Sequence, residues 1–425
     1  MEKIHSLTGM MDLIGNKAQK EDIANKIFYT EEVLKNIFEN YSISEIRTPA
    51  LENSSLFKRS VGDNSDIVNK ELYSFLDKNE KSITLRPEAT ASVIRSVIEK
   101  KIDNETHKFW YLGPMWRYER PQKGRYRQFS QAGIEILGYP EGLAELEMIS
   151  IVCAINKALG IEKPLLKINH LGSKESKQNY CESLKNFLEP LSLELDKKDL
   201  ERLNKNPLRI LDSKNQNIID LLKQCPKINE FVSKDSRNHF EKFLKGLDKN
   251  KICFEKDDNL VRGLDYYNRT VFEYLDNSEN SQNTICAGGR YDYLFENMFN
   301  KKIPALGFAI GIERLLDYID NQIDEEDCIN FYVIILKDKD YIYAQNVADE
   351  IRNYSSAISV VLDYSYGNLK AQLKKANKLN SNYCIIIGEN ESKDNSVQIK
   401  NMNTGNQESV SVENIASYLK TELSI

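Results

Sequence analysis

The sequence of 425 residues lacks most of the common markers of a redox or metal protein. Its seven cysteines are scattered singly, without a Cys-x-x-Cys pair, and they do not indicate a disulfide framework. Its four histidines are isolated, so the sequence predicts neither a zinc site nor a histidine-based nucleophilic triad. We therefore expect structural, buried thiols in a reducing cytosol.

Signals for export or membrane insertion are also missing. The N-terminal MEKIHSLTGMMDLIGN has no basic region followed by an apolar stretch, so no signal peptide is indicated. The apolar run around Met148 to Ile155 is far too short to span a bilayer. We expect a cytoplasmic protein with no membrane partner. The net charge of −6 leaves nucleic-acid binding open, because local basic patches supply phosphate contacts.

A chain of 425 residues is long enough for about two or three domains. Residues 22–41 carry an apolar stripe at helical spacing, which predicts a helix. We expect residues 1–325 to form one domain, interrupted at about 172–251 by a mostly helical insertion rich in Lys, Asn and Asp. In 329–425, strands such as FYVIIL and YCIIIG alternate with helices, which predicts a small α/β domain with a largely parallel sheet.

The stretch RGLDYYNRTVFE, residues 262–273, concentrates polar and aromatic groups before a predicted strand. Arg262 can hold a carboxylate or phosphate bidentately, and the hydroxyls of Tyr266 and Tyr267 can bond a ring nitrogen. We expect these residues and Asp265 to crowd around Gly263, where a glycine lets the backbone approach a ligand closely. The stretch predicts a pocket for a small zwitterion.

Residues 112–138 form a predicted hairpin with Lys123 and Gly124 at its tip. Alternation along 128–137 puts Gln131, Gly133 and Glu135 on one face and aliphatic residues on the other. The glycine between two polar residues is expected to leave floor space for a ligand. An arginine-rich solvated hairpin does not explain why these three residues share a face.

Two further segments pair an extended piece with a helix. In TLRPEATASVIRSV, the Arg86-Pro87 pair forces extension, and a helix is expected to begin near Glu88, so that Glu88 and Thr90 can face a ligand. In PALGFAIGIERLL, Gly311 opens a predicted helix whose apolar stripe carries Arg314.

These segments occur in the order found in histidyl-tRNA synthetases of the bacterial type, and the chain resembles that class II family over nearly its full length. The resemblance implies an α+β catalytic domain built on an antiparallel sheet with a helical insertion, plus a C-terminal α/β anticodon-binding domain. It implies a histidine–tRNA ligase that uses ATP and Mg²⁺ and has tRNA(His) and L-histidine as partners. The segment around Pro49 resembles the family's dimer-forming motif, which implies a homodimer.

The resemblance also implies roles for individual residues. Arg117 and Arg262 would be catalytic, bridging the histidine carboxylate and the α-phosphate of ATP. Arg125 and Arg314 would contact the outer phosphates, with Arg314 stacked on adenine, and Arg120 and Gln122 would meet the tRNA acceptor end. The histidine-binding set would be Glu88, Ala89, Thr90, Arg117, Gln131, Glu135, Arg262, Tyr266 and Tyr267. Within it, Glu135 and Tyr267 would bond the imidazole, while Glu88, Thr90 and Gln131 would hold the α-ammonium group.

The sequence departs from the family pattern at two positions. Ala89 stands where many bacterial relatives have glycine, a change we expect to be tolerated. In AGGRYDYL, Tyr293 replaces the more usual glycine, which matters only where the turn needs a positive φ.

Three other functions are considered. A regulatory subunit of ATP phosphoribosyltransferase shares the catalytic fold, but such proteins typically degrade the RGLDYY segment and lack the terminal α/β domain. A tRNA-binding or sensing module on an inactive synthetase fold is disfavoured by the retention of Arg117, Glu135, Arg262 and Arg314 together. A class II ligase for a small aliphatic amino acid would not need Glu135 opposite Tyr267.

Overall fold

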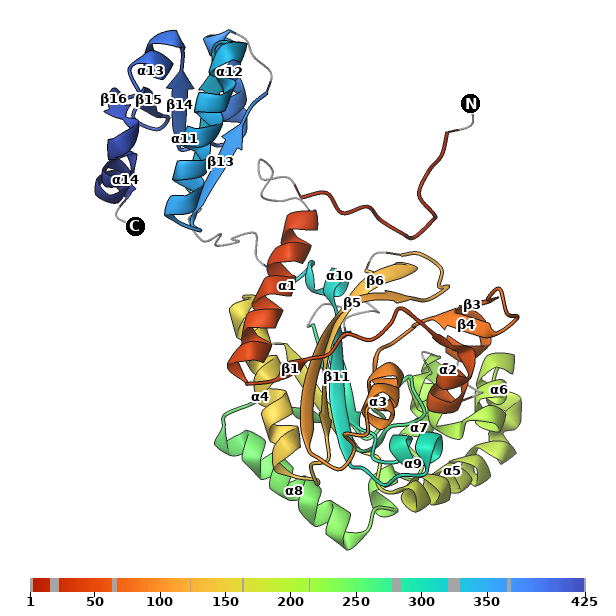
Figure 1. Ribbon diagram of the computed structural model, residues 1–425. Helices are drawn as coiled ribbons and strands as arrows, with labels where there is room; N and C mark the ends of the chain where they lie inside the picture. The colour runs from red at the N-terminus through yellow and green to blue at the C-terminus, as the bar shows by residue number, and fades with distance from the viewer. Residues whose placement is uncertain are drawn as a thin grey trace. The chain divides into compact units, whose positions relative to one another are not determined.

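The computed structural model describes residues 3–15, 23–62, 67–122, 124–162, 164–213, 215–276, 284–319, 329–364 and 368–423 (Figure 1). It contains two compact units, one of residues 1–13 and 26–320 and the other of residues 14–25 and 321–425. Each unit has its own sheet and its own apolar core. None of the helices described is both long and apolar enough to cross a membrane.

The first unit is built on an eight-stranded sheet. Its strands, in spatial order, are β1 (Ser44–Glu45), β5 (His107–Trp116), β6 (Gln128–Leu137), β11 (Ala305–Gly311), β10 (Thr284–Arg290), β9 (Asn268–Leu275), β7 (Leu165–His170) and β8 (Glu255–Lys256). The six central strands pair antiparallel, whereas the short β1 and β8 pair parallel to their neighbours at the two edges. The predicted antiparallel catalytic sheet is therefore confirmed, with a parallel pair added at each edge.

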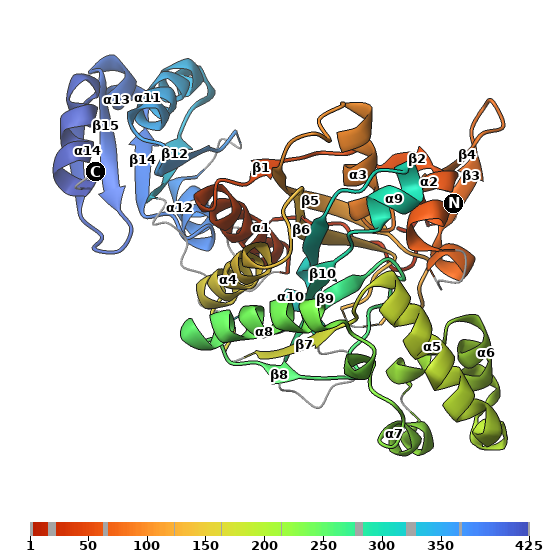
Figure 2. The ribbon, with the colours of Figure 1, turned by 90° about the horizontal axis from the view of Figure 1, so that it is seen from below.

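Helices cover both faces of this sheet (Figures 1 and 2). On one face, α1 (Ile23–Asn40), α4 (Leu143–Ala158) and α8 (Lys234–Lys249) share a core with Ile134 and Ile136 of β6. On the other, α2 (Ser54–Val61), α3 (Thr90–Glu99) and α9 (Leu294–Phe299) pack with Tyr111 of β5. The predicted alternation in β6 is confirmed, because its aliphatic side chains face the first core and Gln131 and Glu135 face the other side.

A small sheet of order β2-β4-β3 lies beside α2 and supports the entry to α3. Its strands are β2 (Leu51–Asn53), β3 (Tyr73–Leu76) and β4 (Ser82–Leu85), and a π-helical turn, η1, spans Ile67–Glu71. The predicted helix after Pro87 begins at Thr90, and Val93, Ile94 and Val97 are buried as its apolar side requires.

Residues 174–249, which we call the helical segment, contain no strand among the residues described. Their elements are α5 (Lys174–Leu188), η2 (Glu189–Glu194), α6 (Lys197–Lys205), η3 (Pro207–Asp212), α7 (Gln216–Leu222), η4 (Ile228–Glu230) and α8. Apolar side chains along these helices, such as Leu184, Leu188 and Ile218, join the core that contains α3 and α9. The helical texture predicted for this stretch is therefore observed.

The N-terminal residues contact the hairpin of β5 and β6. The carbonyl oxygen of Gly9 accepts hydrogen bonds from the backbone nitrogens of Arg127 and Gln128, at 2.8 and 3.2 Å. Gly9 has a φ of +80°, and a Cβ there would lie 3.0 Å from the side chain of Arg127, so only glycine fits this close approach.

The second unit has a five-stranded sheet of order β13-β12-β14-β15-β16. Its elements are β12 (Ile329–Ile335), η5 (Asp338–Asp340), α11 (Tyr341–Tyr354), β13 (Ile358–Leu362), α12 (Leu369–Lys378), β14 (Tyr383–Ile387), α13 (Glu389–Lys393), β15 (Ser396–Asn401), β16 (Gln407–Ser411), η6 (Val412–Asn414) and α14 (Ile415–Leu423). The predicted α/β domain is confirmed, but its sheet is parallel only across β13, β12 and β14. The prediction of a largely parallel sheet was wrong for β15 and β16, because the short α13 and a tight turn with Gly405 at a φ of +79° reverse the chain.

Candidate active site

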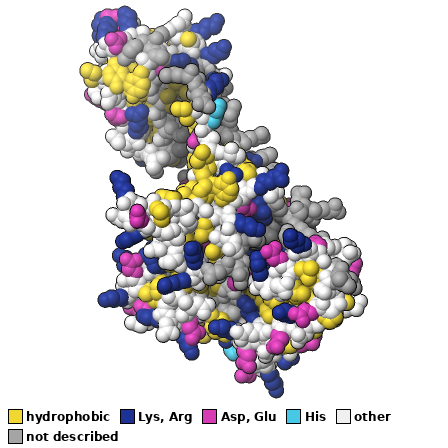
Figure 3. Space-filling model, turned by 90° about the vertical axis from the view of Figure 1, so that its right-hand side faces the viewer, with side chains coloured by type: hydrophobic (Ala, Val, Ile, Leu, Met, Phe, Trp, Pro, Cys, Tyr) yellow, Lys and Arg dark blue, Asp and Glu magenta, His cyan; other side chains and the backbone are white. Residues whose placement is uncertain are grey.

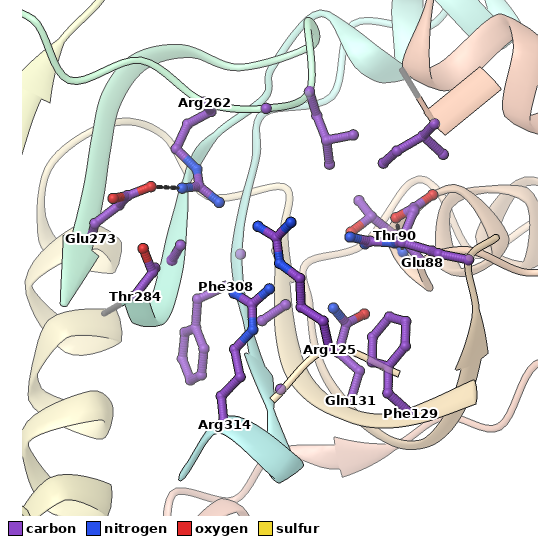
Figure 4. A pocket seen from close by; sticks show the side chains of 18 of the residues that line it. Glu88, Thr90, Arg125, Phe129, Gln131, Arg262, Glu273, Thr284, Phe308 and Arg314 are labelled. Carbon is purple, nitrogen blue, oxygen red and sulfur yellow. Dashed lines mark hydrogen bonds and ion pairs between the residues drawn. The ribbon is translucent and has the colours of Figure 1, made fainter. Parts of the chain in front are cut away.

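A cavity of about 450 Å³ opens on the face of the large sheet that carries Gln131 and Glu135 (Figure 4). Side chains reach it from the entry to α3, from both strands of the hairpin, from residues 262–273 and from α10 (Ile312–Leu315). Of the residues predicted to bind histidine or ATP, those that line it are Glu88, Thr90, Arg117, Arg125, Gln131, Glu135, Arg262, Tyr266, Tyr267 and Arg314. Four separate stretches of sequence thus converge on one cavity.

Glu88 is held at the start of α3 by the helix backbone. Its carboxylate accepts hydrogen bonds from the backbone nitrogens of Thr90 and Ala91, at 2.7 and 3.1 Å. These are donors that a helix N-terminus leaves without a partner inside the helix. Burial raises the pKa of Glu88, although these donors and Arg117 oppose the shift. Ala89, the N-cap of α3, is buried in the apolar core and does not line the cavity.

Glu135 lies on the floor of the cavity and is only 2% exposed. One carboxyl oxygen accepts a hydrogen bond from the Thr90 hydroxyl at 2.6 Å, and the other accepts one from the Tyr291 hydroxyl. Burial raises the pKa of Glu135 to about 8, with a smaller contribution from the nearby Glu88 carboxylate. A carboxyl group in this state suits recognition of a titratable ring nitrogen.

The space beside Gly133 is not free for a ligand, contrary to the prediction. Tyr111, directly opposite on β5, places its hydroxyl 2.4 Å from where a Cβ of Gly133 would stand. Gly133 is therefore needed to admit Tyr111, and Tyr111 itself lines the cavity. The hydroxyl of Tyr111 therefore forms the floor of the cavity between Gln131 and Glu135.

Three guanidinium groups point into the middle of the cavity in Figure 4, those of Arg125, Arg262 and Arg314. Burial lowers the pKa of Arg314, and the neighbouring charges of Arg125 and Arg117 lower it further. Arg314 makes no ion pair with any residue that the structure describes. Arg125 and Arg262 are each paired with one carboxylate, Glu119 and Glu273, but the neighbouring arginines still disfavour the charge on Arg314, which makes this side of the cavity suited to a polyanion.

Arg117 lies between the two sides of the cavity. Its Nε donates a hydrogen bond to the Pro87 carbonyl at 2.9 Å, and its guanidinium lies 5.3 Å from the ring centroid of Phe129. These contacts orient the side chain, and its two terminal nitrogens have no hydrogen-bond partner among the described residues. The adjacent Arg125 pairs with Glu119 at 3.3 Å.

Residues 262–267, which we call the recognition loop, form another wall of the cavity. Arg262 donates to the carboxylate of Glu273 on β9, and its guanidinium lies 5.6 Å from the Tyr267 ring centroid (Figure 4). The rings of Tyr266 and Tyr267 lie 4.8 Å apart, and Tyr291 packs edge-on to both. Burial raises the pKa of Tyr267 to about 12, so its hydroxyl stays a neutral donor at physiological pH.

One expectation for the recognition loop was wrong. Asp265 does not line the first cavity; its carboxylate accepts a hydrogen bond from Asn206 at 2.7 Å and lines a second cavity, which Arg262 also lines. Gly263 lines the first cavity as expected, but it does not adopt a positive φ, and a Cβ there would meet only Arg209, at 3.8 Å. The conformational freedom of glycine is therefore not what shapes this loop.

The remaining predicted residues lie on the loop that joins β5 to β6. Arg120 and Gln122 are exposed and lie outside the cavity, while Gly124 has a φ of +70° in a tight turn closed by Gln122 and Arg125. Lys123, predicted at the tip, lies outside the described residues. Tyr293 has a φ of −86°, so the prediction that its turn tolerates a side chain is confirmed.

Several lining residues escaped the sequence reasoning. Tyr111 stands out only once β5 is paired with β6, and Tyr291, which follows β10, only once its hydroxyl is seen to reach Glu135. Glu313 directly precedes Arg314 and could have been suspected from that position. One oxygen of Glu313 accepts from the Ser130 backbone nitrogen at 2.7 Å, and the other is buried without a partner. Burial raises the pKa of Glu313 to about 7.

Comparisons with known proteins agree with this geometry. The family model for histidyl-tRNA synthetase matches residues 19–315, and that for an anticodon binding domain matches residues 330–422. The chain is similar to a histidine–tRNA ligase of Francisella philomiragia subsp. philomiragia, with 39% identity over 413 residues that cover 96% of each chain.

Among solved structures, apo histidyl-tRNA synthetase of S. aureus is 33% identical, with a TM-score of 0.80 over 99% of this chain and 100% of that one. A chain of Bacillus halodurans described as an ATP phosphoribosyltransferase regulatory subunit/histidyl-tRNA synthetase is 21% identical, with a TM-score of 0.63. It covers 88% of this chain and 97% of its own length, a likeness that shows the fold alone.

Proposed function

The chain belongs to the histidyl-tRNA synthetase family, and from that premise we propose how its cavity carries out histidine–tRNA ligation. The reaction activates L-histidine with ATP to histidyl-adenylate and pyrophosphate, then transfers histidine to the 3′ end of tRNA(His). The observation that carries the proposal is the convergence of Glu135, Tyr267 and the arginines 117, 262 and 314 on one cavity.

In the first step the histidine carboxylate attacks the α-phosphorus of ATP, and the bond to the pyrophosphate leaving group breaks. Such a transfer needs alignment and charge neutralisation more than proton transfer. We assign both tasks to Arg117 and Arg262, which bridge the carboxylate and the α-phosphate. Arg117 is already oriented by Pro87 and Phe129, and Arg262 by Glu273.

Histidine is selected by groups that would stay unpaired with any other side chain. Glu135 and Tyr267 bond the two imidazole nitrogens, and Glu88, Thr90 and Gln131 hold the α-ammonium group. The buried Gln131 oxygen has no partner among the described residues, which supports this role. A site built in this way rejects analogues without the ring nitrogens by roughly 10⁴–10⁵-fold. Ala89 and Tyr266 complete the set: Ala89 occupies the N-cap position of α3 next to Glu88, and Tyr266 packs against Tyr267.

ATP occupies the side of the cavity that carries Arg125 and Arg314, with Arg314 on the adenine and the γ-phosphate. Mg²⁺ is usually bound through one or two carboxylates together with substrate phosphates and water. One buried oxygen of Glu313, next to Arg314, has no partner among the described residues and fits that requirement. Glu313 would hold the ion, which would supply charge neutralisation for the pyrophosphate leaving group.

The tRNA is read at two places. Arg120 and Gln122, exposed on the β5–β6 loop, meet the acceptor end, and the domain of residues 329–425 binds the anticodon. Basic and acidic side chains are interspersed over the face in Figure 3 rather than gathered in one stripe, so no anticodon contacts are assigned. We further propose a catalytic domain of residues 1–325, with an insertion at about 172–251, a homodimer formed through the segment around Pro49, and a cytoplasmic location.

The decisive experiment is ATP–pyrophosphate exchange with each amino acid in turn, followed by aminoacylation of tRNA(His). We expect exchange with histidine alone. In the Arg262→His variant, histidine-dependent exchange should fall by roughly 10³-fold, because one of the two groups that stabilise the transferring phosphoryl is lost. Its thermal unfolding should stay close to that of the wild type. Near-normal exchange in this variant would remove Arg262 from the mechanism.

The role of the β5–β6 loop is tested by Gln122→Ala. We expect charging of tRNA to weaken by about tenfold while ATP–pyrophosphate exchange is unchanged, because the Gln122 side chain lies outside the cavity. Steady-state charging and exchange are measured on the same preparation. An equal loss in both steps would contradict the assignment of Gln122 to the acceptor end.

A further inference from the structure

The recognition loop has a cavity on each side. A second cavity of about 430 Å³ lies behind the loop, and both cavities are lined by Arg209, Arg262, Leu264, Tyr266 and Tyr267. The loop is therefore a thin wall without a continuous layer of packed side chains behind it. A segment of this kind depends on hydrogen bonds to its backbone for a fixed position.

The hydrogen bonds that hold the loop from behind come from the helical segment. The ammonium group of Lys177 on α5 donates to the carbonyls of Asp265 and Tyr267, at 3.2 and 2.7 Å. Arg209 on η3 donates to the Gly263 carbonyl at 2.7 Å, and Asn206 donates to the Asp265 carboxylate at 2.7 Å. The donors come from α5 and from residues 206–209, and they hold the loop at Gly263, Asp265 and Tyr267.

Lys177 is the most demanding of these donors. It is half-buried, and burial lowers its pKa while the charge of Asp265 opposes that shift. A lysine placed in this way loses hydration and regains its hydrogen bonds from the two loop carbonyls. Without the ammonium group, the carbonyls of Asp265 and Tyr267 would lose this donor beside the second cavity. The backbone of Tyr267, whose hydroxyl we assign to the imidazole, would then no longer be held by this hydrogen bond.

We infer that Lys177 is a positioning residue for histidine, and that the helical segment sets the shape of the histidine side of the cavity through Lys177 and Asn206. The inference rests on the proposed function, because it assigns the support of a loop to which histidine binding has been assigned. The inference applies to histidine binding alone, because the ATP side of the cavity, which contains Arg125 and Arg314, does not depend on these contacts.

The test is Lys177→Met, which keeps the length of the side chain and removes the donor, in histidine-dependent ATP–pyrophosphate exchange. We expect the KM for histidine to rise about tenfold, as the loss of a charge-assisted hydrogen bond implies, with the KM for ATP within about twofold. Lys177→Arg retains a donor and should recover most of the affinity. Lys174→Met is the matched control: Lys174 lines the same cavity, but its side chain makes no hydrogen bond or ion pair with a described residue.

A purely structural role for Lys177 would lower the fraction of folded enzyme, and therefore kcat, without changing either KM. A folded Lys177→Met variant with an unchanged KM for histidine would overturn the inference while leaving the proposed function intact. If that variant does not fold, Asn206→Ala decides, with an expected rise of about threefold in the same KM. An unchanged KM there would likewise overturn the inference. A wild-type protein without histidine-dependent exchange would overturn the proposed function and this inference with it.

Discussion

Two groups of buried charges lie against the same sheet, and they differ in how fully they are paired. In the first, which we call the charge network, Arg290 is fully buried and binds Glu145 at 2.7 Å and Asp292 at 3.0 Å. It also donates to the carbonyls of Tyr139 and Pro140, each at 3.2 Å. The network continues from Asp292 through Arg269 to Glu141 and ends at His170.

The active-site cavity is lined by more charged groups, and several of its polar atoms have no partner among the described residues. The buried atoms without a hydrogen bond there include the Nε of Arg125 and of Arg262, and an oxygen of each of Gln131 and Glu313. Buried charges whose hydrogen bonds are satisfied stabilise the fold, whereas polar groups that lack partners in a cavity are available to bind a ligand. The difference in pairing separates the structural charges of this protein from its functional ones.

The variant expected to have the largest effect, and so to test this comparison most strongly, is Arg290→Met. Removing the arginine leaves Glu145 and Asp292 without their shared partner, so we expect the free energy of unfolding of the first unit to fall by about 3–5 kcal/mol. Equilibrium denaturation in urea, followed by circular dichroism, measures this change. The control is Lys205→Met, also in the first unit, whose ion pair with Glu201 is exposed and should contribute little to stability. Similar losses in the two variants would show that pairing in the network adds nothing.

The opposite result is expected for Arg314→Met. Because Arg314 has no ion-pair partner and is surrounded by other arginines, its removal should leave the unfolding free energy unchanged or higher. Activation of histidine should fall by about 10²-fold, since the variant loses a positive group that faces the phosphates. Denaturation and pyrophosphate exchange on one preparation test both halves. A variant that is unstable as well as inactive would place Arg314 with the structural charges.

The smallest effect concerns the cost of keeping Glu135 buried. Its pKa is about 8 in the folded protein and about 4.3 in an unfolded chain, so protonation favours the folded state. That stabilisation is fully present below about pH 4 and is lost as the pH rises through 8. The Glu135→Gln variant does not titrate, so its Tm should exceed that of the wild type by roughly 2–4 °C at pH 8.5 and by less at pH 5.

Thermal scans at several pH values measure the difference, with Glu32→Gln, at an exposed position on α1, as the control. The same Glu135→Gln variant should lose histidine activation. A Tm difference that does not depend on pH would mean that Glu135 carries no electrostatic cost in the folded protein.

Local patterns predicted a large part of the site. Gln131 and Glu135 could be placed because strand alternation is a local property, and Glu88 because Pro87 fixes where α3 can begin. The contribution of Tyr111 could not be predicted, because it depends on the register that sets Tyr111 opposite Gly133. Asp265 was misplaced for a related reason: its partner Asn206 lies in another part of the chain.

The same limit applies to the fold. The apolar runs of β12 and β14 predicted a parallel sheet, but the direction of β15 is decided by the turns around it, and these carry little apolar signal. The charge network was not predicted, because Glu141 and Arg269 are far apart in sequence and their pairing carries no local signal. Sequence patterns identify what a stretch can do, whereas pairing between distant stretches decides what it does.

The contact between Gly9 and the hairpin has a practical consequence for handling this protein. The ribosome makes Gly9 long before Arg127, so the end of the β5–β6 loop next to Arg125 can take its final form only after the chain's beginning folds back onto it. Proteolytic trimming of the first dozen residues would therefore remove a contact of this loop and disturb nucleotide handling at Arg125.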